Sequence, residues 1–214
     1  MVTASSLQAD SSRLGVELDP AAAEGLLVLA AELAEWNRKF NLTSIDDERT
    51  VTHHLLDSLA VGPYLQGQRI ADVGTGAGFP GIPLALAYPG REFVLIDATR
   101  KKLGFVEHVA AKLGLRNVTA VHARAEQYRP PQLFDSVVAR ALARLDQFVR
   151  YAGHLCAPAG RLLAMKGRLD EAEMKSVPRG WRIVATHRVT VPGLDAERHV
   201  VELARVQPRR GNPV

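Results

Sequence analysis

The sequence predicts an α/β fold, a seven-stranded and mainly parallel sheet surrounded by helices, with a helical N-terminal extension. From residue 69 onward, short apolar or β-branched runs alternate with helical patterns, which is typical of a parallel sheet covered by helices. The last two runs are joined only by a short Pro-Gly loop, which predicts an antiparallel last strand. Residues 1–66 show helical spacing instead, so we expect an extension over 1–66 and a sheet domain over 67–214.

The N-terminal extension is predicted to contain two helices. The first fifteen or so residues are polar, and we expect them to fray. A helix then begins at Asp19-Pro20, a capping residue followed by a proline suited to the first turn, and runs to Phe40 with apolar residues in steps of three and four. A second helix is expected from Glu48 to Val61, where Gly62-Pro63 ends it.

The remaining chain divides into alternating strands and helices. The predicted strands are Arg69 to Val73, Glu92 to Ile96, Val118 to His122, Ser136 to Ala139, Arg161 to Met165, Trp181 to Arg188 and His199 to Val206. The predicted helices are Ile82 to Tyr88, Thr99 to Leu113 and Leu145 to Cys156. A parallel sheet closed by an antiparallel strand is the architecture of the Rossmann-like methyltransferases.

Composition places the chain among globular proteins that act inside the cell. It has 214 residues, 47% of them apolar and 23% charged, enough for one substantial core. The segment Met1 to Arg13 has no export pattern, and no apolar run is long enough to span a bilayer. The single cysteine, Cys156, forms no internal disulfide, and we expect it to be a small buried residue within a helix. We therefore expect a cytoplasmic protein without a membrane partner. The net charge of +4 and the isoelectric point near 9.5 favour a polyanionic partner only weakly.

The strongest local pattern is the glycine-rich run from Asp72 to Gly81, between the first strand and the next helix. Its glycines Gly74, Gly76 and Gly78 permit positive φ and leave room for a ligand against the main chain, close to unpaired N–H groups at a helix start. The simplest alternative is that they only form the turn. A dinucleotide fingerprint is a second alternative, but it requires glycine at the sixth position, where this chain has Phe79. The spacing is instead that of methyltransferases.

Asp97 ends the second predicted strand, a little over twenty residues after Gly74. An acidic side chain at this place can accept hydrogen bonds from both hydroxyls of a ribose. It can also cap the helix that begins near Thr99, and the two roles are compatible. The run Arg100-Lys101-Lys102 that follows is interpreted as solvated or facing phosphate.

Several further motifs match one family in order. They are Trp36 to Thr43, His54 to Ser58, Asp72 to Pro83, Phe134-Asp135, Arg140-Ala141, Met165 to Gly167, and Asp195 with Arg198-His199. With these residues the chain resembles the bacterial small-subunit ribosomal RNA guanine-N7 methyltransferases, also called the glucose-inhibited division protein B family. The matches cover nearly the whole chain beyond Leu26.

The resemblance implies S-adenosylmethionine as methyl donor and a guanine in the decoding-region loop of 16S ribosomal RNA as acceptor. It places cofactor contacts at Gly74, Phe79, Ala125, Glu126 and Arg140. We add Gly76, Gly78 and Asp97 to this set on the loop argument above. The partner is then 16S ribosomal RNA, within the small subunit or an assembly intermediate, and we expect a monomer.

Guanine N7 has an in-plane lone pair and no proton, so the implied reaction requires no general base, and we name no catalytic acid or base. Alignment of the reactants is expected to dominate. The candidate substrate contacts, beside Arg140, are Asn41, His54, Asp57 and Lys166.

Simpler interpretations exist for several of these residues. His53-His54 also fits a helix surface with packing in the N-terminal cap, and no metal is expected because no second ligand pair has a fitting spacing. Trp36 and Phe40 are expected to pack in the core. Lys166-Gly167 fits a phosphate contact or a plain strand end equally well. Basic residues near the C-terminus are expected to be solvated, namely Arg205, Arg209 and Arg210.

Three other functions compete with ribosomal RNA methylation. A methyltransferase of the same fold can act on a protein or a small molecule. An NAD-dependent oxidoreductase is disfavoured by Phe79 in the sixth fingerprint position. A non-catalytic RNA-binding module that kept the fold is the third.

Overall fold

The computed structural model describes residues 2–46, 49–140 and 144–206, and its centre is a seven-stranded sheet of order β3-β2-β1-β4-β5-β7-β6. The strands are β1 (Arg69–Val73), β2 (Glu92–Asp97), β3 (Val118–His122), β4 (Phe134–Arg140), β5 (Cys156–Lys166), β6 (Trp181–Val189) and β7 (Arg198–Arg205). Strands β1 to β5 pair in parallel, and β7 pairs antiparallel with both β5 and β6. The predicted fold class and the C-terminal hairpin are confirmed.

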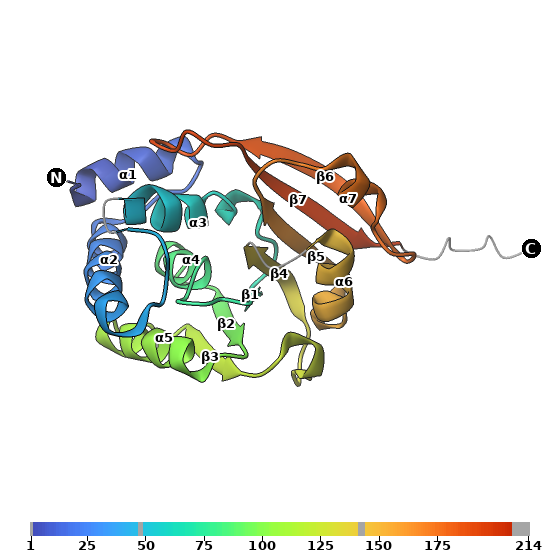
Figure 1. Ribbon diagram of the computed structural model, residues 1–214, viewed down its shortest axis with the longest axis horizontal. Coiled ribbons are helices and arrows are strands. Elements are labelled where there is room, and N and C mark those ends of the chain that lie inside the picture. Colours follow the sequence, from blue (N-terminus) through green and yellow to red (C-terminus); the bar gives the residue numbers. More distant parts are fainter. Residues whose placement is uncertain (1, 47–48, 141–143, 207–214) are drawn as a thin grey trace, which may run out of the picture.

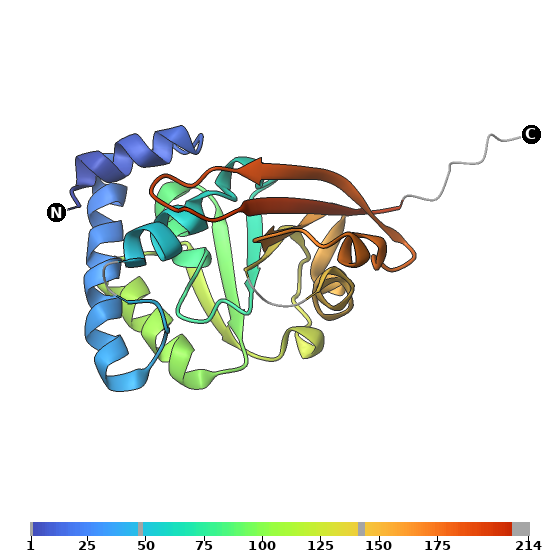
Figure 2. The ribbon, with the colours of Figure 1, turned by 45° about the horizontal axis from the view of Figure 1, so that its top comes forward.

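Helices cover both faces of the sheet (Figure 1). They are α1 (Ala4–Arg13), α2 (Pro20–Phe40), α3 (Asp57–Leu59), α4 (Gly81–Ala87), α5 (Arg100–Lys112), α6 (Leu145–Ala152) and α7 (Glu171–Lys175). Figure 2 shows the blue N-terminal helices at one end of the molecule and the orange helices α6 and α7 at the other. In the described part of the chain, no helix is both long and apolar enough to cross a membrane.

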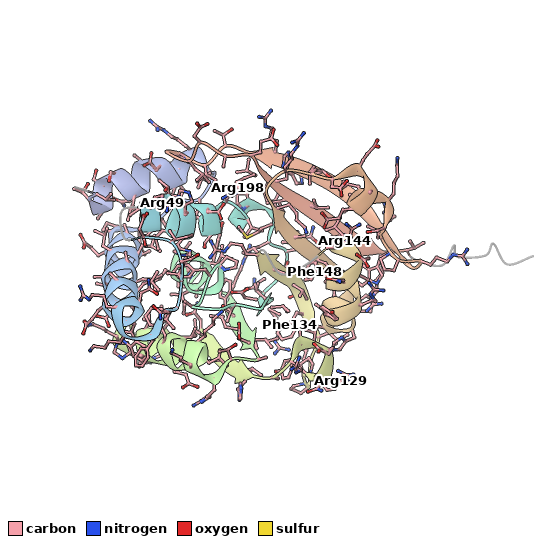
Figure 3. All side chains as sticks on the ribbon, in the orientation of Figure 1. Arg49, Arg129, Phe134, Arg144, Phe148 and Arg198 are labelled. Atoms are coloured by element: carbon pink, nitrogen blue, oxygen red, sulfur yellow. The ribbon has the colours of Figure 1, made fainter. Side chains whose placement is uncertain are left out.

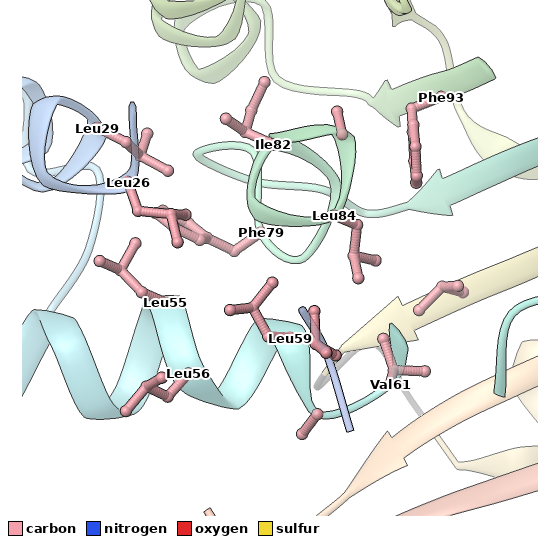
Figure 4. Packing of buried hydrophobic residues seen from close by; sticks show 14 of the residues in the cluster. Leu26, Leu29, Leu55, Leu56, Leu59, Val61, Phe79, Ile82, Leu84 and Phe93 are labelled. Atoms are coloured by element: carbon pink, nitrogen blue, oxygen red, sulfur yellow. The ribbon is translucent and has the colours of Figure 1, made fainter. Parts of the chain in front are cut away.

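The two faces of the sheet bury alternate residues of each strand. Ile70 of β1 and Leu95 of β2 belong to the apolar cluster under α4 and α5, while Ala71 and Val94 belong to the cluster under α6. The first cluster also contains Leu26 of α2 and other residues of the extension, which pack against α4 (Figure 4). The two halves of the chain thus share one core, and the boundary at residue 66 stays a prediction.

A cluster of charges adds to the contact between α2 and α5. Glu32 accepts hydrogen bonds from His108 Nε2 at 2.6 Å and from Lys112 Nζ at 2.5 Å. These two hydrogen bonds lower the pKa of Glu32. Trp36, one turn further along α2, packs against Phe105, with the ring centroids 5.5 Å apart.

The N-terminal helix α1 contradicts the expected fraying. Thr3 and Ser6 cap it reciprocally, Leu7 is fully buried, and Leu14 and Val16 continue into the core. The composition of this segment is polar because only one face of α1 is buried, so composition alone does not predict the helix.

The predicted helix Glu48 to Val61 differs from the structure in form. Glu48 lies outside the described residues; Val51–Leu56 is a π-helical segment, η2, which leads into α3. Gly62-Pro63 does not stop the chain abruptly but begins a 3₁₀ turn, Gly62–Tyr64, in which the proline occupies a first-turn position.

The predicted helix Leu145 to Cys156 is too long. Helix α6 ends at Ala152, a 3₁₀ turn follows, and Cys156 starts β5 opposite Phe134 of β4. A register shift in this pair accommodates the residues up to Arg161, where the strand was expected to begin. Cys156 is buried as expected, but in a strand.

The expected environments of two side chains, Phe40 and Arg205, are also wrong. Phe40 is 37% exposed rather than part of the core, with Lys101 Nζ 5.2 Å from its ring centroid. Arg205 is not simply solvated, because it donates to Gly153 O at 2.7 Å and stacks on Trp181. Arg209 and Arg210 lie outside the described residues.

Candidate functional site

The glycine loop connects β1 to α4 at the carboxyl edge of the sheet. Gly74, Gly76 and Gly78 all have positive φ, at 70°, 59° and 88°. A Cβ on Gly78 would lie 2.7 Å from Ile82 Cγ1, whereas a Cβ on Gly76 would meet no atom within 4 Å. Gly78 is therefore required by packing within the protein. Gly76 borders open space, which a ligand can occupy.

Asp72 supports this loop from below. Its Oδ2 accepts hydrogen bonds from Thr75 Oγ1 at 2.6 Å and from Gly81 N at 2.8 Å, and burial raises its pKa to about 6. Its Oδ1 has no hydrogen-bond partner among the described residues. In the sequence, only the position of Asp72 at the start of the glycine-rich run hints at this role.

Asp97 joins the glycine loop to the start of α5. Its Oδ2 accepts from Gly76 N at 2.9 Å, and its Oδ1 accepts from Thr99 N at 2.8 Å. Asp97 is not the cap that was expected, because Thr99 is the N-cap residue of α5 and no side chain caps it; Asp97 bonds the N–H of that residue instead. Each carboxylate oxygen retains a lone pair that can accept from a ribose hydroxyl.

Two cavities flank the loop, and Gly74 lines both. The smaller, about 290 Å³, has Asp97, Ala125, Glu126 and Tyr151 in its wall. The larger, about 490 Å³, is bounded by Gly76, Phe79, Arg140 and by residues of the N-terminal extension. We refer to them as the Asp97 cavity and the Arg140 cavity.

The N-terminal extension and three strand ends close the Arg140 cavity. Arg140 ends β4, Lys166 ends β5, and Arg198 begins β7. Because β7 runs antiparallel to β5, its first residue lies at the same edge as the last residues of the parallel strands. The extension contributes Thr43, His54 and other residues; the complete lining from it is Leu42, Thr43, Ile45, His53, His54 and Asp57.

Arg140 is held by three acceptors of the extension. Its NH1 donates to His53 O at 2.8 Å and to Asp57 Oδ2 at 3.4 Å, and its NH2 donates to His54 Nδ1 at 3.0 Å. Its guanidinium carbon lies 5.5 Å from the centroid of the Phe79 ring. The guanidinium group of Arg140 is therefore fixed in position beside the glycine loop.

His54 is buried and fixed in one neutral form. Since Arg140 donates to Nδ1, the neutral ring carries its proton on Nε2, which lies 2.9 Å from Thr43 Oγ1. Burial and the charge of Arg140 lower the pKa of His54 to about 3. The ring stacks on Phe79 with centroids 4.5 Å apart. Of the simpler interpretation, a helix-surface position is wrong for His54, whereas packing within the N-terminal cap is confirmed.

Asp57 lies between two arginines. Besides the contact with Arg140, its Oδ1 accepts from Arg198 Nε at 2.7 Å. Figure 3 shows Arg198 beside α3, the helix that begins with Asp57. Only 6% of the Asp57 side chain is exposed, so both carboxylate contacts lie largely out of water.

Lys166 and Asn41 take different positions relative to the cavity. Lys166 lines the cavity, and its Nζ donates to Glu173 Oε1 at 2.6 Å. This ion pair is compatible with both expected roles, a phosphate contact and a plain strand end. Asn41 is the left-handed cap residue after α2, with φ 49°, and does not belong to the lining, although the next two residues do. Its contact with substrate stays a prediction.

Arg198 and Thr43 are residues of the cavity to which the sequence assigned no role. Both occur in the quoted motifs, but nothing local in the sequence signals that the start of β7 meets α3. The run Arg100-Lys101-Lys102, which forms the start of α5, was interpreted only as solvated or facing phosphate, and of it Lys102 lines the Arg140 cavity. No group of three or more His, Cys, Asp or Glu side chains within the described ranges is placed to hold a metal ion.

The residues around Gly74 fit S-adenosylmethionine. The open space at Gly76, the acid Asp97 in one cavity and the cation Arg140 in the other suit a molecule with a nucleoside at one end and an amino acid at the other. The apolar ring of Phe79 forms part of the wall beside the loop.

Comparisons with known proteins agree with this geometry. Residues 23–201 match the family model GidB, described as rRNA small subunit methyltransferase G. The chain is 48% identical over 198 residues to a protein of Nitrosococcus oceani named ribosomal RNA small subunit methyltransferase G, covering 92% of this chain and 91% of that one.

Solved structures with low sequence identity share the fold. A SAM-dependent methyltransferase from Aquifex aeolicus superposes with a TM-score of 0.58 at 17% identity, over 76% of this chain and 96% of that chain. A SAM-dependent methyltransferase from Thiobacillus denitrificans in complex with S-adenosyl-L-homocysteine gives 0.54 at 13% identity, over 77% and 100%. The fold is therefore that of the Rossmann-like methyltransferases.

Proposed function

Because the chain belongs to the family of rRNA small subunit methyltransferase G, a family of S-adenosylmethionine-dependent enzymes, we propose that it methylates N7 of a guanine in the decoding-region loop of 16S ribosomal RNA. The observation that carries the proposal is the pair of cavities that share Gly74. One offers the chemistry for a nucleoside. The other is large enough to admit a purine beside it.

The cofactor contacts proposed are those expected from the sequence. Gly74, Gly76 and Gly78 shape the loop, and Asp97 accepts from the ribose. The segment Ala125-Glu126, which lines the Asp97 cavity, can pair with the adenine edge. On the other side of the loop, Phe79 and Arg140 form the wall toward the methyl group.

The substrate contacts proposed are Asn41, His54, Asp57 and Lys166. The last three line the Arg140 cavity, and Asn41 lies next to its lining. Lys102 adds positive charge to the lining, which favours a polyanion. We also propose that the protein acts as a monomer in the cytoplasm, on the small subunit or an assembly intermediate.

When bound, S-adenosylmethionine supplies a sulfonium methyl group that the lone pair of guanine N7 can accept, the C–S electron pair staying on sulfur. No proton leaves N7 in this transfer, so the protein has to orient rather than deprotonate. Arg140, fixed by His53, His54 and Asp57, cannot swing into the path of the base. Alignment of the two reactants, the sulfonium methyl group and N7, supplies roughly 7–11 kcal/mol in favourable cases.

We assign residues 1–66 to the acceptor side of the site and residues 67–214 to the methyltransferase domain. The extension provides six residues of the Arg140 cavity and none of the Asp97 cavity.

The test is transfer of labelled methyl to small subunits from cells that lack the gene. Naked 16S ribosomal RNA, assembly intermediates and finished subunits are compared, and the modified nucleotide is mapped. Label on N7 of one guanine supports the proposal. Label on a protein, or none on ribosomal RNA, favours the competing methyltransferase, and RNA binding without transfer favours the binding module.

A further inference from the structure

The pair of Arg198 and Asp57 at the Arg140 cavity has no role in cofactor binding as described above. Arg198 belongs to β7, far along the chain from the glycine loop, yet its Nε contacts Asp57 Oδ1 at 2.7 Å and both residues line the cavity. Its NH1 donates to Glu197 O, and its NH2 makes no hydrogen bond within residues 2–46, 49–140 and 144–206. These contacts use two of the five N–H bonds of the guanidinium, and the other three, including both on NH2, have no acceptor among the described residues and can donate to a ligand.

Asp57 also has unused hydrogen-bonding capacity. Its carboxylate has about four acceptor sites, and two arginines use two of them. The pair therefore presents an acceptor and a donor side by side, in a wall where 6% of the Asp57 side chain and 24% of the Arg198 side chain are exposed.

Guanine has the complementary order of groups on one edge. Its N1–H donates and the adjacent O6 accepts, whereas adenine has an accepting N1 and a donating 6-amino group. A carboxylate next to a guanidinium matches guanine and opposes adenine at both positions. N7 lies outside the N1/O6 pair, so this contact leaves it accessible.

We propose that Asp57 and Arg198 select guanine as the methyl acceptor, Asp57 accepting from N1–H and Arg198 donating to O6. The inference rests on the proposed function, which supplies the guanine. A phosphate contact by Arg198 is the main alternative. It is disfavoured because the adjacent Asp57 carboxylate repels an anion.

His199 holds the start of β7, and with it Arg198, at the edge of the cavity. Its Nδ1 lies 2.7 Å from Gly167 O, and it pairs with Lys166 across the β5–β7 ladder. The start of β7 is therefore fastened to the cavity edge independently of Asp57, and loss of the Arg198 side chain is expected to leave the backbone in place.

The experiment compares Arg198→Met with Arg182→Met, the same change at an exposed residue of β6 in the same hairpin. Small subunits are reconstituted from transcribed 16S ribosomal RNA that has guanine or adenine at the mapped position. Single-turnover rates with enzyme in excess make slow transfer measurable. Calorimetry with S-adenosylhomocysteine and thermal melting check cofactor binding and folding.

Arg198→Met is expected to slow transfer to guanine by about 10- to 100-fold, the usual effect of one lost hydrogen bond to a charged group. Transfer to adenine is expected to stay the same or rise, so the guanine preference falls at least about tenfold. Arg182→Met and the affinity for S-adenosylhomocysteine are expected to change less than about twofold. Arg198→Lys keeps the positive charge but lacks the planar guanidinium group, and its transfer rate and guanine preference are expected to lie between those of wild type and Arg198→Met.

Equal slowing on both bases, with a weaker dependence on salt, would mean a phosphate contact and overturn the proposal. An unchanged rate on guanine would overturn it as well. Absence of any guanine methylation by the wild-type enzyme would instead overturn the proposed function, and the wild-type arm alone reveals that outcome.

Discussion

At the scale of single residues, the site depends on side chains and glycines whose conformations are fixed by their neighbours. Asp57 is enclosed by two arginines, Asp72 lies under the loop, and His54 has a partner on each ring nitrogen. These groups are fixed before any ligand arrives. We therefore expect some substitutions here to change ligand affinity and others to change how the free energy of unfolding depends on pH.

Gly76→Ala tests the open space at the glycine loop. We expect it to weaken binding of S-adenosylhomocysteine by about tenfold or more, which is about 1.4 kcal/mol, because the new methyl group enters the ligand's space. Gly114→Ala is the matched control, since Gly114 also has positive φ and open space but lies after α5, away from both cavities. Both changes are expected to cost about 1–2 kcal/mol of unfolding free energy. Similar affinities for the two variants in calorimetry would contradict the assignment of the loop.

His54 predicts a dependence of stability on pH. Its pKa is about 3 in the folded protein and ordinary, near 6.5, when unfolded, so the unfolded chain binds more protons between these values. Stability contributed by His54 is therefore complete above about pH 6.5 and is lost as the pH falls toward 3, by at most about 1.4 kcal/mol per pH unit.

The comparison that isolates this effect uses His54→Gln and His122→Gln, the latter at an exposed residue. Urea unfolding between pH 7 and pH 4.5 is expected to show a shallower decline for His54→Gln than for wild type. His122→Gln is expected to follow wild type. Equal slopes for all three proteins would show that His54 is not held neutral.

At the scale of elements, the N-terminal helices form part of the core rather than an appendage. Helix α2 packs on α4 and α5, and η2 and α3 carry the residues that hold Arg140. Figure 4 shows leucines of α2 and of η2 and α3 around Phe79 and Ile82. Stability of the extension and shape of the site are thus linked.

Leu7→Ala tests whether α1 contributes to that core. Leu7 is fully buried, and a leucine truncated in a core costs about 2–5 kcal/mol. Val2→Ala, at an exposed residue before the helix, is expected to change the unfolding free energy by less than about 0.5 kcal/mol. Equal stability of both variants in urea unfolding would restore the expectation that the first fifteen residues fray.

At the scale of the whole molecule, the periodic parts of the fold were predictable and the irregular parts were not. The cap at Asp19-Pro20 and the run to Phe40 predict α2 at its observed bounds, because a capping signal marks the start and the apolar periodicity continues to Phe40. The start of β5 at Cys156 carries no such signal, since residues 157–160 contain proline and glycine and resemble a turn. The pairing with Phe134 that extends the strand is a tertiary contact.

The site was predictable to the same extent. The glycine spacing and Asp97 are local patterns that point to the loop and its ligand. Arg198 reaches Asp57 only because β7 reverses direction and brings its first residue to the carboxyl edge of β4 and β5. Neither residue indicates the other in sequence, so their pairing required the three-dimensional arrangement.

The measurement that tests the account most directly is calorimetric titration of the protein with S-adenosylhomocysteine and, separately, with NAD. The two cavities at Gly74 predict saturable binding of one S-adenosylhomocysteine per chain and no binding of NAD. No heat from S-adenosylhomocysteine, even with small ribosomal subunits present, would contradict the assignment of this site.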